Sequence, residues 1–185
     1  RPGTVFTGFR TPDFLADIAQ YRTAPKLLMV RDPRDIAVSG YFSSAFSHGL
    51  PKGGAVRDQL LKNRERVRQM EPSEYVLRGS ADAPMRNLLV FMDHLDRFEG
   101  FVVRRYEDVI FDKAALARDI AGALSAEVPA ERLDAIAAKN DVRPDAERPT
   151  EHIRQVSPGN FREHLSAEAQ AYLETKFAPG FNRLA

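Results

Sequence analysis

The sequence has no cysteine, almost no net charge and no long apolar run. The lack of cysteine excludes disulfides, thiolate chemistry and zinc sites of the CxxC type. Its 27 basic and 26 acidic residues leave a formal charge of +1, so there is no general attraction to nucleic acid or to a membrane surface. Any anion site must therefore be local. No apolar stretch approaches the ~20 residues of a membrane span, and no grouping of side chains suggests a metal site.

The bulk composition is that of one globular domain. A chain of 185 residues can bury a proper core but is short for two domains, and 43% hydrophobic with 29% charged residues argues against disorder. The sequence opens on Arg1-Pro2-Gly3 without a methionine. We therefore interpret residues 1–185 as a single domain that is incomplete at its N-terminus.

Short apolar runs and helical periodicity alternate along the chain. Residues 26–30 and 101–105 read as buried strands, and residues 4–9 could supply a third. Apolar residues three or four apart predict helices over 13–21, 56–70, 84–99, 113–124, 131–139 and 166–177. Strands separated by helices indicate an α/β domain with a parallel sheet. Residues 140–162 form a long irregular passage, which is typical of a functional loop or a surface crossover.

The turn after the first strand has the features of a phosphate site. Asp32 stands at an N-cap position, Pro33 fits the first helical turn, and Asp35 follows three residues after Asp32. The helix N-terminus then directs free amides towards the carboxyl edge of the strand, where Arg31 emerges. Ser39 lies eight positions after Arg31, about two turns up the helix. A guanidinium, a hydroxyl and a helix N-terminus together suit a phosphate.

The second strand ends in a similar way, in Arg-Arg-Tyr-Glu-Asp at 104–108. Because ligands bind beyond the carboxyl ends of parallel strands, Arg31 and Tyr106 should open onto one crevice, where the ring could pack on a base. Asp108 could brace the Arg31 loop or cap the next helix. Plainer readings remain open. In these, Arg31 pairs with Asp35 or Asp108, Ser39 is a small residue at a helix contact, and Tyr106 is half buried at a sheet end.

Three segments in order, "VRDPRDIAVSGYF", "RRYEDV" and "HIRQVSPGNFREHLS", resemble the cytosolic-type sulfotransferase family over about residues 4 to 177. The resemblance implies a three-layer α/β/α fold with a central parallel sheet, like that of P-loop NTPases. It also implies a cytoplasmic enzyme that moves a sulfuryl group from 3′-phosphoadenosine 5′-phosphosulfate (PAPS) to a hydroxyl or amine. The acceptor would be a small molecule or a glycan, and neither a metal nor nucleic acid is required.

The family's nucleotide-binding residues can be matched to positions of this chain. Arg31 and Ser39 match the pair that holds the 3′-phosphate, and Tyr106 matches a tyrosine beside the adenine. Arg154 matches the arginine of a C-terminal RKG-x-x-G-x-W loop that closes over the 3′-phosphate. Gly159 and Phe161 take the later Gly and Trp places of that loop, so the 140–162 passage would be a cofactor-closing segment.

The departures from the family pattern concern the phosphate loops. Gln155 and Val156 replace a lysine and a glycine of the C-terminal loop, which removes one cation. Nothing before Arg31 matches the family's lysine- and glycine-bearing PKSGT-like loop for the 5′-phosphosulfate, which we expect to precede Arg1. Lys52-Gly53-Gly54 reads as an ordinary turn.

The catalytic base is unassigned, because Arg10 occupies the place of the family's histidine and arginine cannot accept a proton. Arg10 could instead bind an anionic acceptor or the sulfuryl oxygens, or serve the structure. His48 lies in a loop that could line an acceptor pocket or simply face solvent, whereas His94 looks structural. Two further readings stay open: a catalytically impaired binding or interaction module, and a P-loop kinase relative.

Overall fold

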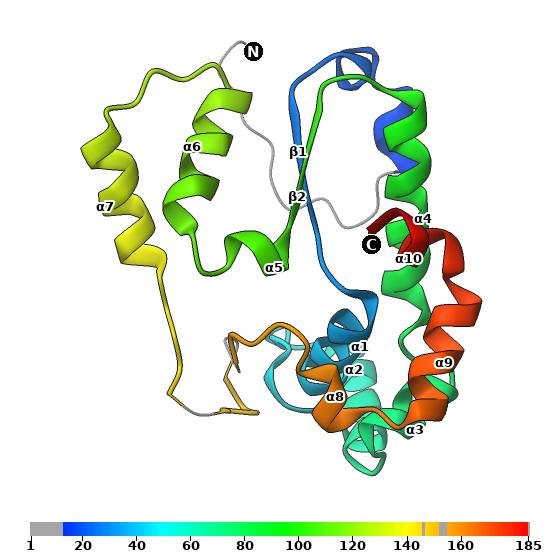
Figure 1. Cartoon of the computed structure of the whole chain (residues 1–185). Helices are drawn as coiled ribbons and strands as arrows, with labels where there is room; N and C mark the ends of the chain where they lie inside the picture. The colour runs from blue at the N-terminus through cyan, green and yellow to red at the C-terminus, as the bar shows by residue number, and fades with distance from the viewer. Residues whose placement is uncertain (1–12, 146, 152–154, 185) are drawn as a thin grey trace.

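The structure is a computed structural model that describes residues 13–145, 147–151 and 155–184. These residues are mostly helical and contain one small sheet (Figure 1). The strands are β1 (Lys26–Val30) and β2 (Phe101–Arg105). The α-helices are α1 (Pro33–Phe42), α2 (Ala55–Arg68), α3 (Pro72–Leu77), α4 (Asp82–Arg97), α5 (Tyr106–Val109), α6 (Lys113–Ala123), α7 (Ala130–Asn140), α8 (Phe161–His164), α9 (Ala167–Lys176) and α10 (Ala178–Leu184). Two 3₁₀ segments, η1 (Asp13–Asp17) and η2 (Ala19–Arg22), and a π-helical segment, η3 (Ser43–Ser47), complete the set.

The two strands pair in parallel, as the sequence predicts. Their register runs from Lys26 opposite Phe101 to Val30 opposite Arg105, so both strands end at the same edge of the sheet. A parallel pair needs a crossover between its strands, and the helices from α1 to α4 supply it. The predicted third strand over 4–9 lies outside the described residues. The chain is therefore an α/β protein at the coarse level, with two strands in the part that the structure describes.

Helices lie on both sides of this sheet (Figure 1). On one side, Leu88 and Met92 of α4 pack against Leu28 and Val30 of β1. On the other side, Arg104 of β2 pairs with Asp119 of α6. The predicted three-layer fold calls for a larger central sheet than the two strands found between residues 13 and 184, so only its α/β character is shown here.

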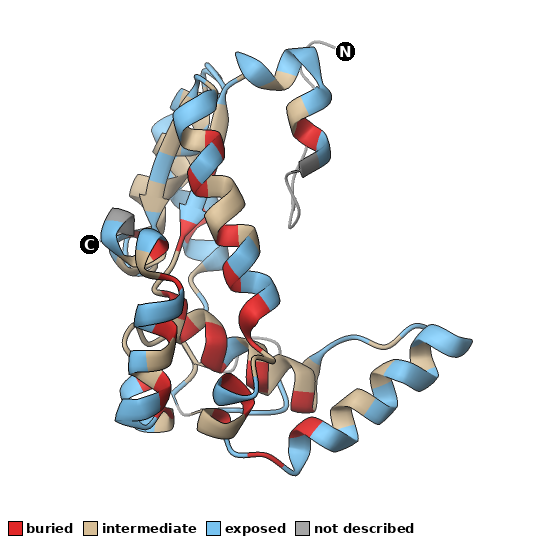
Figure 2. Cartoon of the chain, turned by 90° about the vertical axis from the view of Figure 1, so that its right-hand side faces the viewer, coloured by how far each residue is buried: buried red, intermediate tan, exposed pale blue. Residues whose placement is uncertain are grey.

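The main core lies beyond the carboxyl edge of the sheet and surrounds α1. Figure 2 shows buried residues gathered in the lower half of the molecule, where α1, α3, α8 and α9 meet. Val38 of α1, Val76 of α3, Met85 of α4, Phe161 of α8 and Leu173 of α9 are all fully buried members of this cluster. The core therefore fixes the helix that begins at the candidate phosphate turn.

Most of the predicted helices are present with small shifts at their ends. The segments predicted at 56–70, 84–99, 113–124, 131–139 and 166–177 correspond to α2, α4, α6, α7 and α9. The helix predicted over 13–21 is wrong in type, because this part of the chain forms two short 3₁₀ helices. The sequence did not predict α3, α8 or α10, which are seven residues or shorter.

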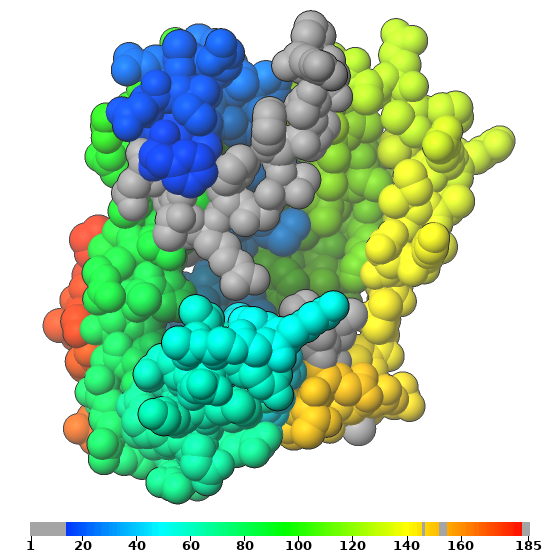
Figure 3. Space-filling view, turned by 180° about the vertical axis from the view of Figure 1, so that it is seen from behind, coloured from blue at the N-terminus to red at the C-terminus, as the bar shows by residue number. Residues whose placement is uncertain are grey.

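The segments η3, α2 and α7 lie at the surface of the molecule. Seen from behind, η3 and α2 (cyan) cover the lower part of one face, and α7 (yellow) lies along one side (Figure 3). Within the described ranges, none of the helices is both long and apolar enough to cross a membrane.

Candidate functional site

Arg31 and Tyr106 lie in contact at the carboxyl edge of the sheet. Each follows directly on the last residue of its strand, and the parallel register places Val30 opposite Arg105. The guanidinium carbon of Arg31 is 4.4 Å from the centre of the Tyr106 ring. Such stacking holds a guanidinium in place while its N–H groups stay able to bind an anion. The predicted proximity of these two residues is therefore present, whereas a shared crevice for a ligand stays a prediction.

The guanidinium of Arg31 is poorly satisfied. Its Nε atom is buried and has no hydrogen-bond partner among the residues that the structure describes. The nearest carboxylate described is that of Asp35, whose Oδ2 lies 3.9 Å from Nη2. At that distance the pair is an ion pair without a hydrogen bond. The plainer reading, in which Arg31 pairs with Asp35, is thus correct in partner, but the contact leaves the guanidinium donors of Arg31 with capacity for a ligand.

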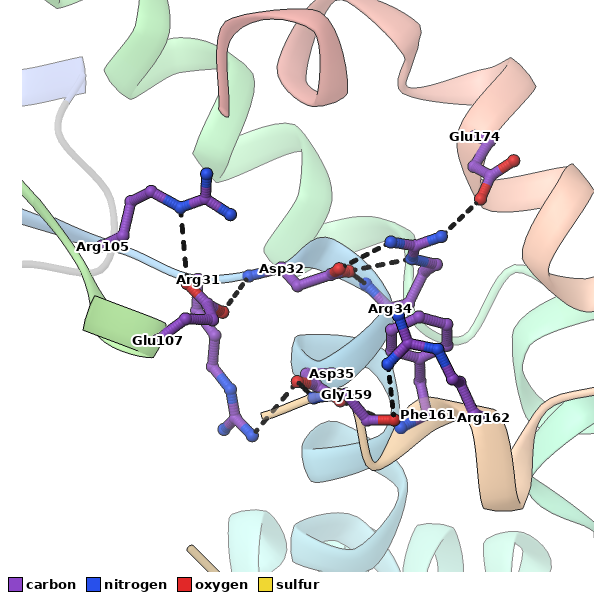
Figure 4. A network of polar contacts seen from close by, with 10 residues as sticks. All are labelled: Arg31, Asp32, Arg34, Asp35, Arg105, Glu107, Gly159, Phe161, Arg162 and Glu174. Atoms are coloured by element: carbon purple, nitrogen blue, oxygen red, sulfur yellow. Dashed lines mark hydrogen bonds and ion pairs between the residues drawn. The ribbon is translucent and has the colours of Figure 1, made fainter. Parts of the chain in front are cut away.

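Asp35 ties the C-terminal loop to α1. Its side chain is buried, and its two oxygens accept hydrogen bonds from the backbone N–H groups of Gly159 at 2.8 Å and Phe161 at 2.9 Å (Figure 4). Gly159 has φ of +82°, a left-handed conformation that favours glycine. One carboxylate thereby holds the third motif beside the first, although the two are more than 120 residues apart in the chain. The sequence suggested Asp35 for a capping arrangement or a pair with Arg31, and it did not predict this link to the C-terminal loop.

The start of α1 is braced by Glu107 and not by Asp108, which corrects the sequence prediction. The Asp32 side chain caps the helix by accepting from the backbone N–H of Arg34 at 2.8 Å. The backbone N–H of Asp32 donates to Glu107 Oε1, also at 2.8 Å (Figure 4). The cap of the longer helix α6 is Asp112. The acidic residue after Tyr106 therefore joins the end of β2 to the turn after β1.

Arg34 is the second arginine of the turn, and its guanidinium already donates hydrogen bonds to neighbouring carboxylates. Its Nη2 lies 2.7 Å from Asp32 Oδ2, and its Nη1 lies 2.6 Å from Glu174 Oε1 of α9 (Figure 4). The guanidinium also lies 4.0 Å from the centre of the Phe161 ring. The hydrogen bond to Asp32 is the main reason that the pKa of Arg34 is raised. Arg34 thus secures the helix start, whereas Arg31 stacks on Tyr106 and makes only a loose ion pair with Asp35.

The pKa of Tyr106 is shifted by its burial and by the charged residues of the same cluster. Burial raises the pKa of its phenol above the ordinary value, and the positive charge of Arg31 opposes that rise. The charges of Asp35 and Glu107 add to the increase in the pKa. Tyr106 is therefore held as a neutral ring at ordinary pH, which suits a stacking surface.

Among the other predicted binding residues, the structure describes Ser39 alone, and no contact between Ser39 and Arg31 is found. Ser39 is exposed on α1, one turn beyond Asp35, and its hydroxyl makes no hydrogen bond among the residues described. Arg154 and Arg10 lie outside the described residues. His94 is buried and its Nδ1 lies 3.0 Å from the Tyr21 hydroxyl, in keeping with a structural role. His48 is exposed just after η3.

The cluster has the chemistry of an anion site: a guanidinium with unused donors, an aromatic ring beside it and the N-terminus of a ten-residue helix. The part of the chain that the structure describes has no group of three or more His, Asp or Glu residues suited to a metal ion. No protein-family model matches this chain, and neither the curated proteins nor the solved structures include a match. The geometry and the motifs therefore carry the functional argument.

Proposed function

We propose that this protein binds the 3′-phosphate of PAPS at the Arg31 turn and acts as a sulfotransferase on a hydroxyl or amine acceptor. The observation that carries the proposal is the Arg31 guanidinium, which stacks on the Tyr106 ring and donates no hydrogen bond to any residue that the structure describes. The unused N–H groups of a guanidinium favour a bound phosphate, which accepts charge-assisted hydrogen bonds from them. The free amides at the start of α1 add to the attraction.

Each predicted site residue has a part in this proposal. Arg31 and Ser39 hold the 3′-phosphate, the ring of Tyr106 lies by the adenine, and Arg154 closes over the phosphate. The hydrogen bonds from Gly159 and Phe161 to Asp35 support the last role, because they fix the end of the Arg154 segment beside α1. The sulfuryl group would transfer in line, with cations stabilising the leaving phosphate and a base, as yet unassigned, removing the acceptor proton.

The proposed enzyme class has a three-layer α/β/α fold of the P-loop-NTPase type. The parallel pairing of β1 with β2 supports this assignment, as do α4 and α6 on opposite faces of the pair. The site also lies where such folds bind ligands, beyond the carboxyl ends of the strands.

Calorimetric titration with adenosine 3′,5′-bisphosphate tests the proposal. We expect Arg31→Ala to weaken binding tenfold or more, since a hydrogen bond to a charged group contributes ~1.5–3 kcal/mol. Arg97→Ala is the matched control, because Arg97 is an exposed arginine of α4 in a surface pair with Asp93. Equal affinity for the wild type and Arg31→Ala would remove the basis of the proposal.

Two alternatives give different results in the same experiments. A catalytically impaired binding module, which Gln155 and Val156 favour by removing a cation and a flexible position from the loop, would bind the bisphosphate without transferring sulfuryl groups. A P-loop kinase relative would prefer ATP to PAPS. Measured transfer from PAPS to a panel of phenols, amines and sugars separates the sulfotransferase from both.

A further inference from the structure

A pocket lies at the opposite end of α1 from Arg31. Its volume is about 310 Å³, within the range of small-molecule sites. The residues that define its character are the aromatic residues Tyr41, Phe42 and Phe46 and the polar residues Glu71, Glu163 and His164. Because α1 has ten residues, its two ends are about 15 Å apart, so this pocket is separate from the phosphate turn.

Aromatic rings from α1 and η3 form one wall of this pocket. The ring centres of Tyr41 and Phe42 are 5.1 Å apart and nearly perpendicular, and those of Phe42 and Phe46 are 6.1 Å apart. The imidazole of His164 in α8 meets the Phe42 ring edge to face at 5.1 Å. The Tyr41 hydroxyl donates to the Met70 carbonyl at 2.8 Å, which fixes its ring. Several rings that meet at steep angles form the kind of surface that binds organic cations.

The polar lining of the pocket is mainly acidic. Glu71 precedes α3 and Glu163 lies in α8, and both are exposed. The Asn160 side-chain amide donates to Glu163 Oε2 at 3.2 Å, which orients that carboxylate. The pKa of Tyr41 is raised by burial and, secondly, by the negative charge of Glu71. The field of Glu71 therefore acts on the aromatic wall.

A cation already lies against one of these rings. The guanidinium carbon of Arg68 is 5.5 Å from the centre of the Phe46 ring, and its Nε donates to the Ala45 carbonyl. Arg68 is not among the described residues that line the pocket, and the charged ones among these are Glu71, Glu163 and, when protonated, His164. The pocket thus combines an aromatic wall with an excess of negative charge.

We propose that the pocket between α1, α3 and α8 binds a small organic ammonium ion with an apolar body. The apolar body would pack on the rings, the ammonium group would lie against their π faces, and the carboxylates of Glu71 and Glu163 would neutralise its charge. The proposal does not depend on sulfotransferase activity or on nucleotide binding.

Binding of three probes of equal shape and different charge tests this proposal. They are phenethylammonium, the neutral 2-phenylethanol and the anion phenylacetate. We expect phenethylammonium to bind with a Kd of about 1 mM or lower, and the neutral and anionic probes at least tenfold more weakly. Amide chemical shifts recorded during the titration should change at the end of α1, before α3 and in α8.

Variants identify the groups responsible. We expect the double substitution Glu71→Gln with Glu163→Gln to weaken phenethylammonium binding about tenfold, and Phe46→Leu to weaken it severalfold. The matched control is Glu74→Gln, because Glu74 is a partly exposed glutamate of α3 that pairs with Arg78. Glu74→Gln should bind phenethylammonium as the wild type does, and so should Arg31→Ala.

The unfolding midpoint of every variant is measured first, so that lost binding is not confused with lost folding. The proposal is overturned if the three probes bind equally, if none binds at millimolar concentration, or if the carboxylate variants bind phenethylammonium as the wild type does. Loss of ammonium binding in Arg31→Ala would also overturn it, since the pocket would then be part of the phosphate site. Failure of bisphosphate binding alone leaves this inference intact.

Discussion

Replacing Asp35 by alanine should destabilise the protein far more than replacing an ordinary surface aspartate. The Asp35 carboxylate is 1% exposed and accepts two backbone hydrogen bonds, at 2.8 and 2.9 Å, from Gly159 and Phe161. Each hydrogen bond to a charged group contributes ~1.5–3 kcal/mol, and its loss here leaves a backbone N–H unpaired, that of Phe161 being buried. We therefore expect Asp35→Ala to lower the free energy of unfolding by ~3–5 kcal/mol.

Urea unfolding followed by circular dichroism measures this loss. At an m-value of ~2–3 kcal/mol per molar urea, the midpoint should fall by ~1–2.5 M. The control is Asp93→Ala, which removes an exposed carboxylate paired with Arg97 and should cost less than ~1 kcal/mol. Limited proteolysis should also cut the 141–160 segment faster in Asp35→Ala. If both variants unfold at the same urea concentration, then Asp35 does not anchor the loop and our reading of the cluster is wrong.

Three further measurements test other parts of the structure. Arg31→Ala should raise the pKa of Tyr106 further, because the charge of Arg31 lowers it; an unchanged phenolate titration would contradict their contact. Because burial raises the pKa of Tyr106 in the folded protein, unfolding should become easier above about pH 10, where the unfolded chain loses the phenol proton first. Gly100→Ala should cost ~2 kcal/mol or more of folding stability in thermal melts, because φ is +79° and a Cβ would lie 2.7 Å from the Ala24 carbonyl oxygen. Ser39→Ala should leave the melting temperature unchanged but weaken calorimetric bisphosphate binding three- to tenfold, the effect of one hydrogen bond; equal affinity would remove Ser39 from the site.

Local patterns were sufficient for the longer elements. The continuous apolar run before Arg31 and the run after Gly100 predicted both strands, and apolar spacing predicted α2, α4, α6, α7 and α9. The shorter helices α3 and α8 lacked such a signal, because one or two turns carry too few residues to show a period. Their positions are instead set by packing against α1 and α9.

Side-chain partners were harder to predict. From the sequence, either Asp35 or Asp108 could pair with Arg31, because the position of a carboxylate in the chain does not show where its side chain points. The structure assigns Glu107, rather than Asp108, to the backbone of the Arg31 turn. It also shows Asp35 bound mainly to the C-terminal loop, with Arg31 as a loose ion-pair partner. A signal was present, since an acid among the buried positions of α1 must have partners.

The sequence alone was enough to predict the two strands and the longer helices, because a proline, a helix cap or an apolar run acts over only a few residues. It also marked Arg31 and Tyr106 as the ends of two strands. Only the fold decided which distant groups meet, because parallel pairing and core packing bring β2 and the C-terminal loop to the start of α1. The pocket at the C-terminal end of α1, formed by residues of α1, η3 and α8 and residues at the start of α3, could not be predicted from the sequence for the same reason.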